Sequence, residues 1–123
     1  MQTVYVVEDS VLVRERLIEM LDATPGTLVV GAAARADEAI RDILEERPDV
    51  VLLDLKLAQG SGFDVLRVVH ERAPEVTVYM LSSFAFDPYR QLAARLGAQD
   101  FFDKSSEFER VRDIIAARSA TKH

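Results

Sequence analysis

Five apolar runs, rich in β-branched residues, recur along the chain and are separated by stretches with a different pattern. The runs are TVYVV (3–7), TLVVGAA (27–33), VVLLDL (50–55), VTVYML (76–81) and the weaker QDFFD (99–103). Between them, apolar residues recur every three or four positions, which is the spacing of one buried stripe on an α-helix. Strands that alternate with helices predict a parallel sheet covered by helices on both faces, so the chain is limited to an α/β fold.

The helical stretches begin and end at residues typical of helix boundaries. Their apolar stripes cover residues 13–21, 36–44, 62–69, 89–96 and 108–115. Ser10 is placed to cap the first helix, and Pro48 ends the second because the residue before proline disfavours helical geometry. Ser106, followed three residues later by Glu109, has the form of a capping box at the start of the fifth. These boundaries agree with the periodicity.

The expected strand order is 2-1-3-4-5, one of the two common doubly wound arrangements. Right-handed crossovers leave few other topologies for a five-stranded parallel sheet. In this flavodoxin-like (βα)5 order the run 99–103 is an edge strand, which suits its low apolar content. The 123 residues correspond to one domain, residues 1–123, with no linker or repeat.

Composition excludes several classes of protein. The formal net charge is −6, which argues against direct binding of nucleic acid. There is no cysteine, so disulfides, thiolate metal sites and a cysteine nucleophile are excluded. No apolar run approaches the roughly 20 residues that cross a bilayer, and the N-terminus lacks a signal-peptide pattern. We therefore expect a cytoplasmic domain without membrane insertion.

Charged and hydroxyl side chains follow four of the predicted strands, at the edge where open α/β sheets bind ligands. They are Glu8 and Asp9, then Asp54, Ser82 and Lys104. Each alone has an ordinary interpretation as a strand-end or surface residue, but the sheet would bring all five to one rim. Clustered carboxylates raise each other's pKa, and a hard divalent cation relieves this. The all-oxygen set predicts Mg²⁺, since no histidine or cysteine is present at these ends to favour zinc.

An aspartate beside Mg²⁺, with an ammonium and a hydroxyl opposite, is equipped to attack phosphorus. At these positions the chain resembles the receiver domains of two-component response regulators, of which the chemotaxis response regulator is the simplest. The resemblance covers essentially the whole chain. It rests on the pair Glu8–Asp9, Asp54 in LLDLKLAQGSG, Ser82 in YMLSS, and Lys104 in GAQDFFDKS.

The resemblance implies a role for each matched residue. Asp54 would be the phosphoacceptor, and Lys104 and Ser82 would stabilise the phosphoryl group. Mg²⁺ would be held by Glu8, Asp9, Asp54 and the backbone carbonyl of Lys56. Ser82 and Phe101 would form the conformational switch, and Gly62 would be the glycine of the loop after the acceptor strand.

The implied function is a phosphorylation-activated signalling domain. Asp54 would take a phosphoryl group from the phosphohistidine of a sensor histidine kinase or phosphotransfer protein. Such a domain catalyses only its own phosphorylation and dephosphorylation, and is not an enzyme with a separate substrate. A downstream protein would bind the surface formed by the helix at 89–96, the strand at 99–103 and the helix at 108–115. The kinase, the target, a homodimer, and whether the domain stands alone or belongs to a longer regulator are left open.

Several residues depart from the family pattern. Ala58 stands where proline is usual, and Ser105 follows Lys104 where a proline with a cis bond is common; whether that bond is cis or trans is left open. We hypothesise that Lys56, two residues after the acceptor, tunes the phosphoryl lifetime. Phe84 and Phe86 either pack beside Tyr89 or join it and Phe101 in an apolar output surface.

Two other functions are compatible with the sequence. One is a receiver-like interaction module that is not phosphorylated, although the set of site residues is complete. The other is a Mg²⁺-dependent aspartyl-phosphate hydrolase of the haloacid dehalogenase type. That family has a D-x-D motif at the end of its first strand, whereas here the two acids are adjacent and the candidate nucleophile follows the third strand.

Overall fold

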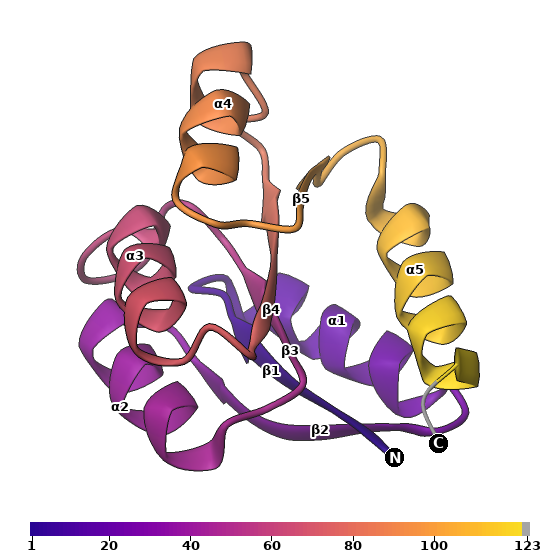
Figure 1. The fold of residues 1–123 in the computed structure, drawn as a ribbon. Helices are drawn as coiled ribbons and strands as arrows, with labels where there is room; N and C mark the ends of the chain where they lie inside the picture. Colours follow the sequence, from indigo (N-terminus) through magenta and orange to yellow (C-terminus); the bar gives the residue numbers. More distant parts are fainter. Residues whose placement is uncertain (122–123) are drawn as a thin grey trace.

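The predicted sheet is present in a computed structural model, which describes residues 1–121 of the chain. Five parallel strands lie in the order β2-β1-β3-β4-β5 and alternate with five helices, as Figure 1 shows. The elements are β1 (Gln2–Val7), α1 (Val11–Asp22), β2 (Thr27–Ala33), α2 (Ala36–Glu46), β3 (Val50–Leu53), α3 (Gly62–Arg72), β4 (Thr77–Ser82), α4 (Asp87–Arg95), β5 (Asp100–Asp103) and α5 (Phe108–Thr121). The flavodoxin-like fold and its strand order are thereby confirmed.

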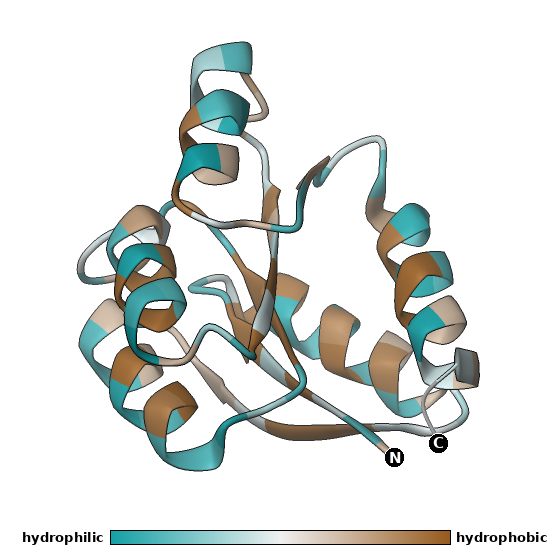
Figure 2. Ribbon diagram, in the orientation of Figure 1, coloured by the Kyte–Doolittle hydropathy of each residue, from teal (hydrophilic) through white to brown (hydrophobic). Residues whose placement is uncertain are grey.

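Helices cover both faces of the sheet, and successive residues of each strand point to opposite faces. On one face, Val4 and Val6 of β1 pack in the cluster that contains the buried residues of α1 and α5. On the other face, Tyr5 and Val7 pack in the cluster that contains those of α2, α3 and α4. Figure 2 shows the apolar central strands enclosed between helices whose outer surfaces are hydrophilic. Burial on both faces explains why VVLL in β3 is apolar throughout.

Helix boundaries follow the sequence closely at the first two helices. The Ser10 hydroxyl accepts the N–H of Val13 at 3.4 Å and caps α1, as predicted. The helix α2 ends at Glu46, and Arg47 before Pro48 has a left-handed backbone with φ of 50°. Among the described residues, no helix is long and apolar enough to cross a bilayer.

The start of α5 differs from the prediction. The helix begins at Phe108, so Glu107 and not Ser106 precedes the first helical residue, and the predicted capping box is wrong. The carbonyl of Glu107 accepts the N–H of Arg110, and its carboxylate accepts the N–H of Asp103 at 3.0 Å. The helix start is therefore set by a contact back to the end of β5, which local spacing cannot reveal.

Candidate functional site

The register of the sheet brings the predicted site residues to one edge. Val7 at the end of β1 pairs with Leu53 at the end of β3, so Glu8 and Asp54 leave adjacent strands at the same level. Ser82 at the end of β4 pairs with Asp103 of β5, which places Lys104 next along the rim. The five charged and hydroxyl residues predicted from the strand ends thus share the carboxyl edge of the sheet.

The ammonium of Lys104 bridges two buried carboxylates. Its Nζ lies 2.6 Å from Oε1 of Glu8 and 2.8 Å from Oδ2 of Asp54. The side chains are nearly removed from solvent, with exposed fractions of 15% for Lys104, 1% for Glu8 and 7% for Asp54. Charge-assisted hydrogen bonds of this length are stronger than neutral ones. The lysine therefore neutralises negative charge where water cannot.

Burial and ion pairing shift the pKa values of Glu8 and Lys104 in opposite directions. Burial raises the pKa of the Glu8 carboxyl above its ordinary value, and the nearby charge of Asp54 adds to the rise. The hydrogen bond from Lys104 acts against it without cancelling it. For Lys104, burial lowers the pKa, but the hydrogen bonds to Asp54 and Glu8 outweigh burial, so the pKa of the ammonium is raised. The lysine is thus held in its charged form.

Backbone donors fix the remaining carboxylate oxygens. Oε2 of Glu8 accepts the N–H of Ser10 at 3.0 Å, and Oδ1 of Asp54 accepts the N–H of Leu55 at 2.7 Å. The main chain of Asp54 is itself tied to β1, since its N–H donates to the carbonyl of Val7 at 2.9 Å. Each carboxylate therefore has one oxygen on the lysine and the other on a backbone amide.

Gly62 allows the loop after β3 to approach the acceptor candidate. A Cβ atom at Gly62 would lie against the main-chain oxygen of Asp54 and 2.9 Å from Cα of Leu55. The N–H of Gly62 donates to the carbonyl of Leu55 at 2.7 Å, which closes the loop at the start of α3. A glycine is required here by close backbone contact. This gives a structural reason for the glycine that the resemblance assigned to the loop.

Three carboxylates lie close enough to share one cation. Glu8, Asp9 and Asp54 each offer an oxygen, and these oxygens lie within 4.8 Å of one another. Glu8 and Asp54 are buried, whereas Asp9 is exposed at the mouth of the cluster. A compact all-oxygen donor set with excess negative charge and an open side fits a hard divalent cation such as Mg²⁺.

Ser82 and Phe101 both lie inside the molecule. Ser82 is fully buried, and its hydroxyl accepts the N–H of Phe84 at 3.1 Å. Its carbonyl accepts the N–H of Lys104 at 3.0 Å, so the ends of β4 and β5 are joined at the rim. Phe101 is 4% exposed and packs with the core on the α2, α3 and α4 face. The peptide bond between Lys104 and Ser105 is trans.

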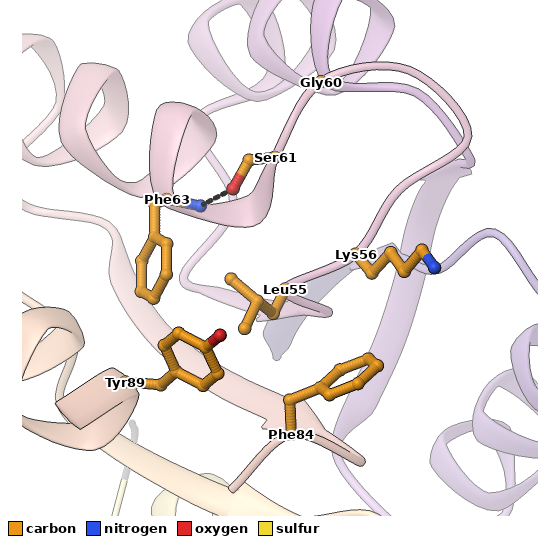
Figure 3. A pocket seen from close by; sticks show the side chains of 7 residues that line it. All are labelled: Leu55, Lys56, Gly60, Ser61, Phe63, Phe84 and Tyr89. Carbon is orange, nitrogen blue, oxygen red and sulfur yellow. Dashed lines mark hydrogen bonds between the residues drawn. The ribbon is translucent and has the colours of Figure 1, made fainter. Parts of the chain in front are cut away.

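A pocket of ≈ 340 Å³ is lined in part by Leu55 and Lys56, the two residues that follow Asp54 in the chain. Figure 3 shows the rings of Phe63, Phe84 and Tyr89 around Leu55, with Lys56 at one end. The ring of Tyr89 lies 6.2 Å from that of Phe63 and 5.9 Å from that of Phe86. Packing of Tyr89 and Phe86 as neighbours is thus confirmed. Phe84 and Phe86 also remain 41% and 60% exposed, so this packing leaves an apolar surface uncovered.

Comparison with known proteins identifies a single family over most of the chain. The profile described as "Response regulator receiver domain" matches residues 4–116. The chain is 38% identical over 104 residues to protein-glutamate methylesterase/protein-glutamine glutaminase 3 of Geobacter sulfurreducens, covering 85% of this chain and 28% of that protein. It is 34% identical over 123 residues to the DNA-binding transcriptional activator DevR/DosR of Mycobacterium tuberculosis, covering 97% of this chain and 57% of that protein.

Solved structures agree with this assignment. The response regulator domain of Thermotoga maritima CheB superposes with a TM-score of 0.85 at 29% identity, covering 98% of this chain and 94% of that one. The chain spans only 28% and 57% of the length of the two curated relatives named above.

The raised pKa of Glu8 predicts a pH-dependent cost of keeping this side chain charged. In the folded protein without a divalent cation, that cost is absent below the ordinary pKa of glutamate, about 4.3, grows as the pH rises from there to the raised pKa, and is constant above it. Glutamine carries no charge at any pH. The unfolding free energy of Glu8→Gln relative to wild type should therefore increase as the pH rises from about 4 toward the raised pKa of Glu8.

Urea denaturation in the presence of a chelator, repeated across this range, measures the difference. Glu15→Gln removes an exposed carboxylate from α1 and is the matched control. A difference in unfolding free energy between Glu8→Gln and wild type that stays constant with pH would contradict the raised pKa of Glu8. A difference that becomes less favourable to the variant as the pH rises would also contradict it.

Proposed function

The chain belongs to the response regulator receiver domain family, and on this premise we propose that Asp54 is its phosphoacceptor and that phosphorylation switches a partner-binding surface. The observation that carries the proposal is the position of the Asp54 carboxylate. It lies at the end of a central strand, with Lys104 2.8 Å from one oxygen and two further acids close enough to share a cation. A receiver domain is a signalling domain, and the relatives of this one include a DNA-binding transcriptional activator.

In the proposed reaction, an oxygen of Asp54 attacks the phosphorus of a phosphohistidine. The new O–P bond forms as the P–N bond breaks, and the electron pair of that bond returns to the imidazole of the donor. Lys104 leaves Oδ2 of Asp54 and pairs with a phosphoryl oxygen, and the hydroxyl of Ser82 turns from the N–H of Phe84 toward another. These groups neutralise the charge that develops on the transferred group.

Glu8, Asp9, Asp54 and the backbone carbonyl of Lys56 are the residues that would hold Mg²⁺. The bound ion would supply positive charge that screens the three carboxylates from one another and from the incoming phosphoryl group. Glu8 would have to share its carboxylate between the ion and Lys104, since Oε1 is 2.6 Å from Nζ. Asp9 is the exposed member of the set and would be the first acid that the ion meets.

The conformational output is proposed to follow from Ser82 and Phe101. When the hydroxyl of Ser82 turns toward the phosphoryl group, the N–H of Phe84 loses its partner and the loop after β4 is free to move. The carbonyls of Ala85 in that loop and of Phe101 both accept hydrogen bonds from Arg90, so movement of the loop can be transmitted to Phe101. Biasing such a two-state arrangement changes the surface of α4, β5 and α5.

The partners proposed for this domain are of two kinds. The donor is a sensor histidine kinase or a phosphotransfer protein, and the receiver of the signal is a protein that binds the α4, β5 and α5 surface. We place the reaction in the cytoplasm, and we propose that the domain acts as a phosphoacceptor and not as an enzyme with its own substrate. The net charge of −6 supports an output that does not involve nucleic acid at this domain.

Phosphorylation by acetyl phosphate with Mg²⁺ tests the proposed function. Intact mass spectrometry should show one added phosphoryl group on the wild-type protein and none on Asp54→Asn, which keeps the shape of the side chain and removes the nucleophilic oxygen. Lack of addition to the wild type would favour an unphosphorylated interaction module. Continuous release of phosphate from a generic phosphomonoester would favour the hydrolase.

Loss of Asp9 should weaken binding of Mg²⁺. Asp9→Asn removes one charge from the proposed ligand set, so the affinity for Mg²⁺ should fall by at least about tenfold, a change typical of lost support at a metal site. Titration followed by calorimetry measures the affinity. Asp22→Asn, an exposed acid at the end of α1, is the control and should bind as the wild type does. Equal affinities for all three proteins would remove Asp9 from the site.

Lys56 is proposed to lengthen the life of the phosphoryl group. Its side chain is exposed at the mouth of the pocket, where a cation can pair with a phosphoryl oxygen and hinder the approach of water. Lys56→Ala should therefore lose phosphate faster than the wild type, whereas Lys56→Arg keeps the charge and should resemble it. Dephosphorylation after removal of the donor gives the rates. Unchanged rates in Lys56→Ala would exclude this role.

A further inference from the structure

Arg90 of α4 joins the two loops that flank the proposed site. Its Nε donates to the carbonyl of Ala85 at 3.2 Å, and one terminal nitrogen donates to the carbonyl of Phe101 at 2.6 Å. The other terminal nitrogen lies 3.3 Å from Oε1 of Glu107. The guanidinium therefore binds the loop after β4, the strand β5 and the residue that precedes α5.

Both loops continue directly into the residues of the proposed reaction. Ala85 lies three residues after Ser82, whose hydroxyl accepts the N–H of Phe84. Glu107 accepts the N–H of Asp103, next to Lys104, and the N–H of Lys104 donates to the carbonyl of Ser82. The contacts of Arg90 thus close a ring of hydrogen bonds that contains the backbone of both Ser82 and Lys104.

The helix α4 depends on few other contacts. Within α4, all of whose residues are described, Ala93 alone is buried. The guanidinium of Arg90 is 5.3 Å from the centre of the Phe101 ring, so it covers the aromatic side chain as well as its carbonyl. Its side chain is 35% exposed, whereas that of Glu107 is 22% exposed. Three acceptors in fixed directions suit a planar guanidinium, which a lysine ammonium cannot replace.

We propose that Arg90 is a positioning residue that couples the loop after Ser82 to the turn that carries Lys104. By holding α4 against β5 and over the buried Phe101, it makes the two loops move together. Movement of the loop after β4 would then displace Lys104, and displacement of Lys104 would in turn move Ser82. The proposal rests on the proposed function for its consequence in phosphorylation, but the coupling itself is a property of the unphosphorylated protein.

Amide hydrogen exchange in the unphosphorylated protein tests the coupling directly. The amides of Phe84 and Lys104 do not touch Arg90, yet both are hydrogen-bonded within the ring. In Arg90→Gln their exchange should rise together by about two- to tenfold, which corresponds to the loss of about one net hydrogen bond. Arg90→Lys should give an intermediate rise because one ammonium cannot reach three acceptors. Amides of β1, such as that of Val6, should be unchanged.

Arg95→Gln is the matched control. Arg95 is an exposed arginine on the same helix, so its replacement removes the same charge without the ring of hydrogen bonds. It should leave exchange at Phe84 and Lys104 as in the wild type. A double-mutant cycle with Glu107→Ala adds a second measurement. Because Arg90 and Glu107 contact each other, part of their effect is shared, so the exchange effects of the two variants should not be fully additive.

A second readout concerns phosphorylation by acetyl phosphate at saturating donor. Arg90→Gln should lower the rate several-fold while the affinity for Mg²⁺ stays unchanged, because no proposed metal ligand is altered. A purely stabilising role of the arginine would give equal rates and raise exchange throughout the core.

The outcomes separate this inference from the proposed function. Exchange that rises in only one of the two loops, or equally in Arg95→Gln, would overturn the coupling whether or not Asp54 is phosphorylated. Absence of phosphorylation in the wild-type protein would overturn the proposed function. A joint rise at Phe84 and Lys104, with a slower reaction in Arg90→Gln, supports the inference.

Discussion

The ammonium of Lys104 holds together two buried carboxylates that would otherwise repel each other. Glu8, Asp54 and Lys104 are far apart in the sequence, and only the parallel sheet places them at one edge. The strand β4 lies between β3 and β5, so the long side chain of lysine is needed to reach Asp54 across it. The strand order, the end of each strand and the length of one side chain therefore determine the centre of the site together.

A role in chemistry explains these buried charges better than a role in stabilising the fold. Replacing a buried ion pair with well-packed apolar residues is often neutral or stabilising, because desolvation offsets most of the attraction between the charges. Burial raises the pKa of the Glu8 carboxyl even though Lys104 is 2.6 Å away, so pairing with the lysine does not fully offset the cost of burying this charge. A cluster that retains excess negative charge beside one cation is suited to binding another, and its lysine is suited to exchange one oxygen partner for another.

Most of the fold and the identity of the central residues could be predicted from the sequence, since strand runs and strand ends are local patterns. The strand order and the convergence of Glu8, Asp54 and Lys104 followed from general rules of parallel sheets. The direct pairing of Glu8 with Lys104 was not predicted, because the sequence places Glu8 beside a cation without saying which one. The contacts of Arg90 and the start of α5 at Phe108 were also missed. They depend on hydrogen bonds between loops of different strands, and no spacing in the sequence encodes them.

The exchange of partners by Lys104 is the step on which the proposed reaction depends. A crystal structure of the protein with Mg²⁺ and beryllofluoride, a tetrahedral mimic of the phosphoryl group, tests it most directly. We predict beryllium on an oxygen of Asp54, a fluorine within hydrogen-bond distance of Nζ of Lys104, and the metal ion against Asp9. Beryllofluoride bound elsewhere, or Lys104 still paired with Oδ2 of Asp54 and out of reach of every fluorine, would contradict it.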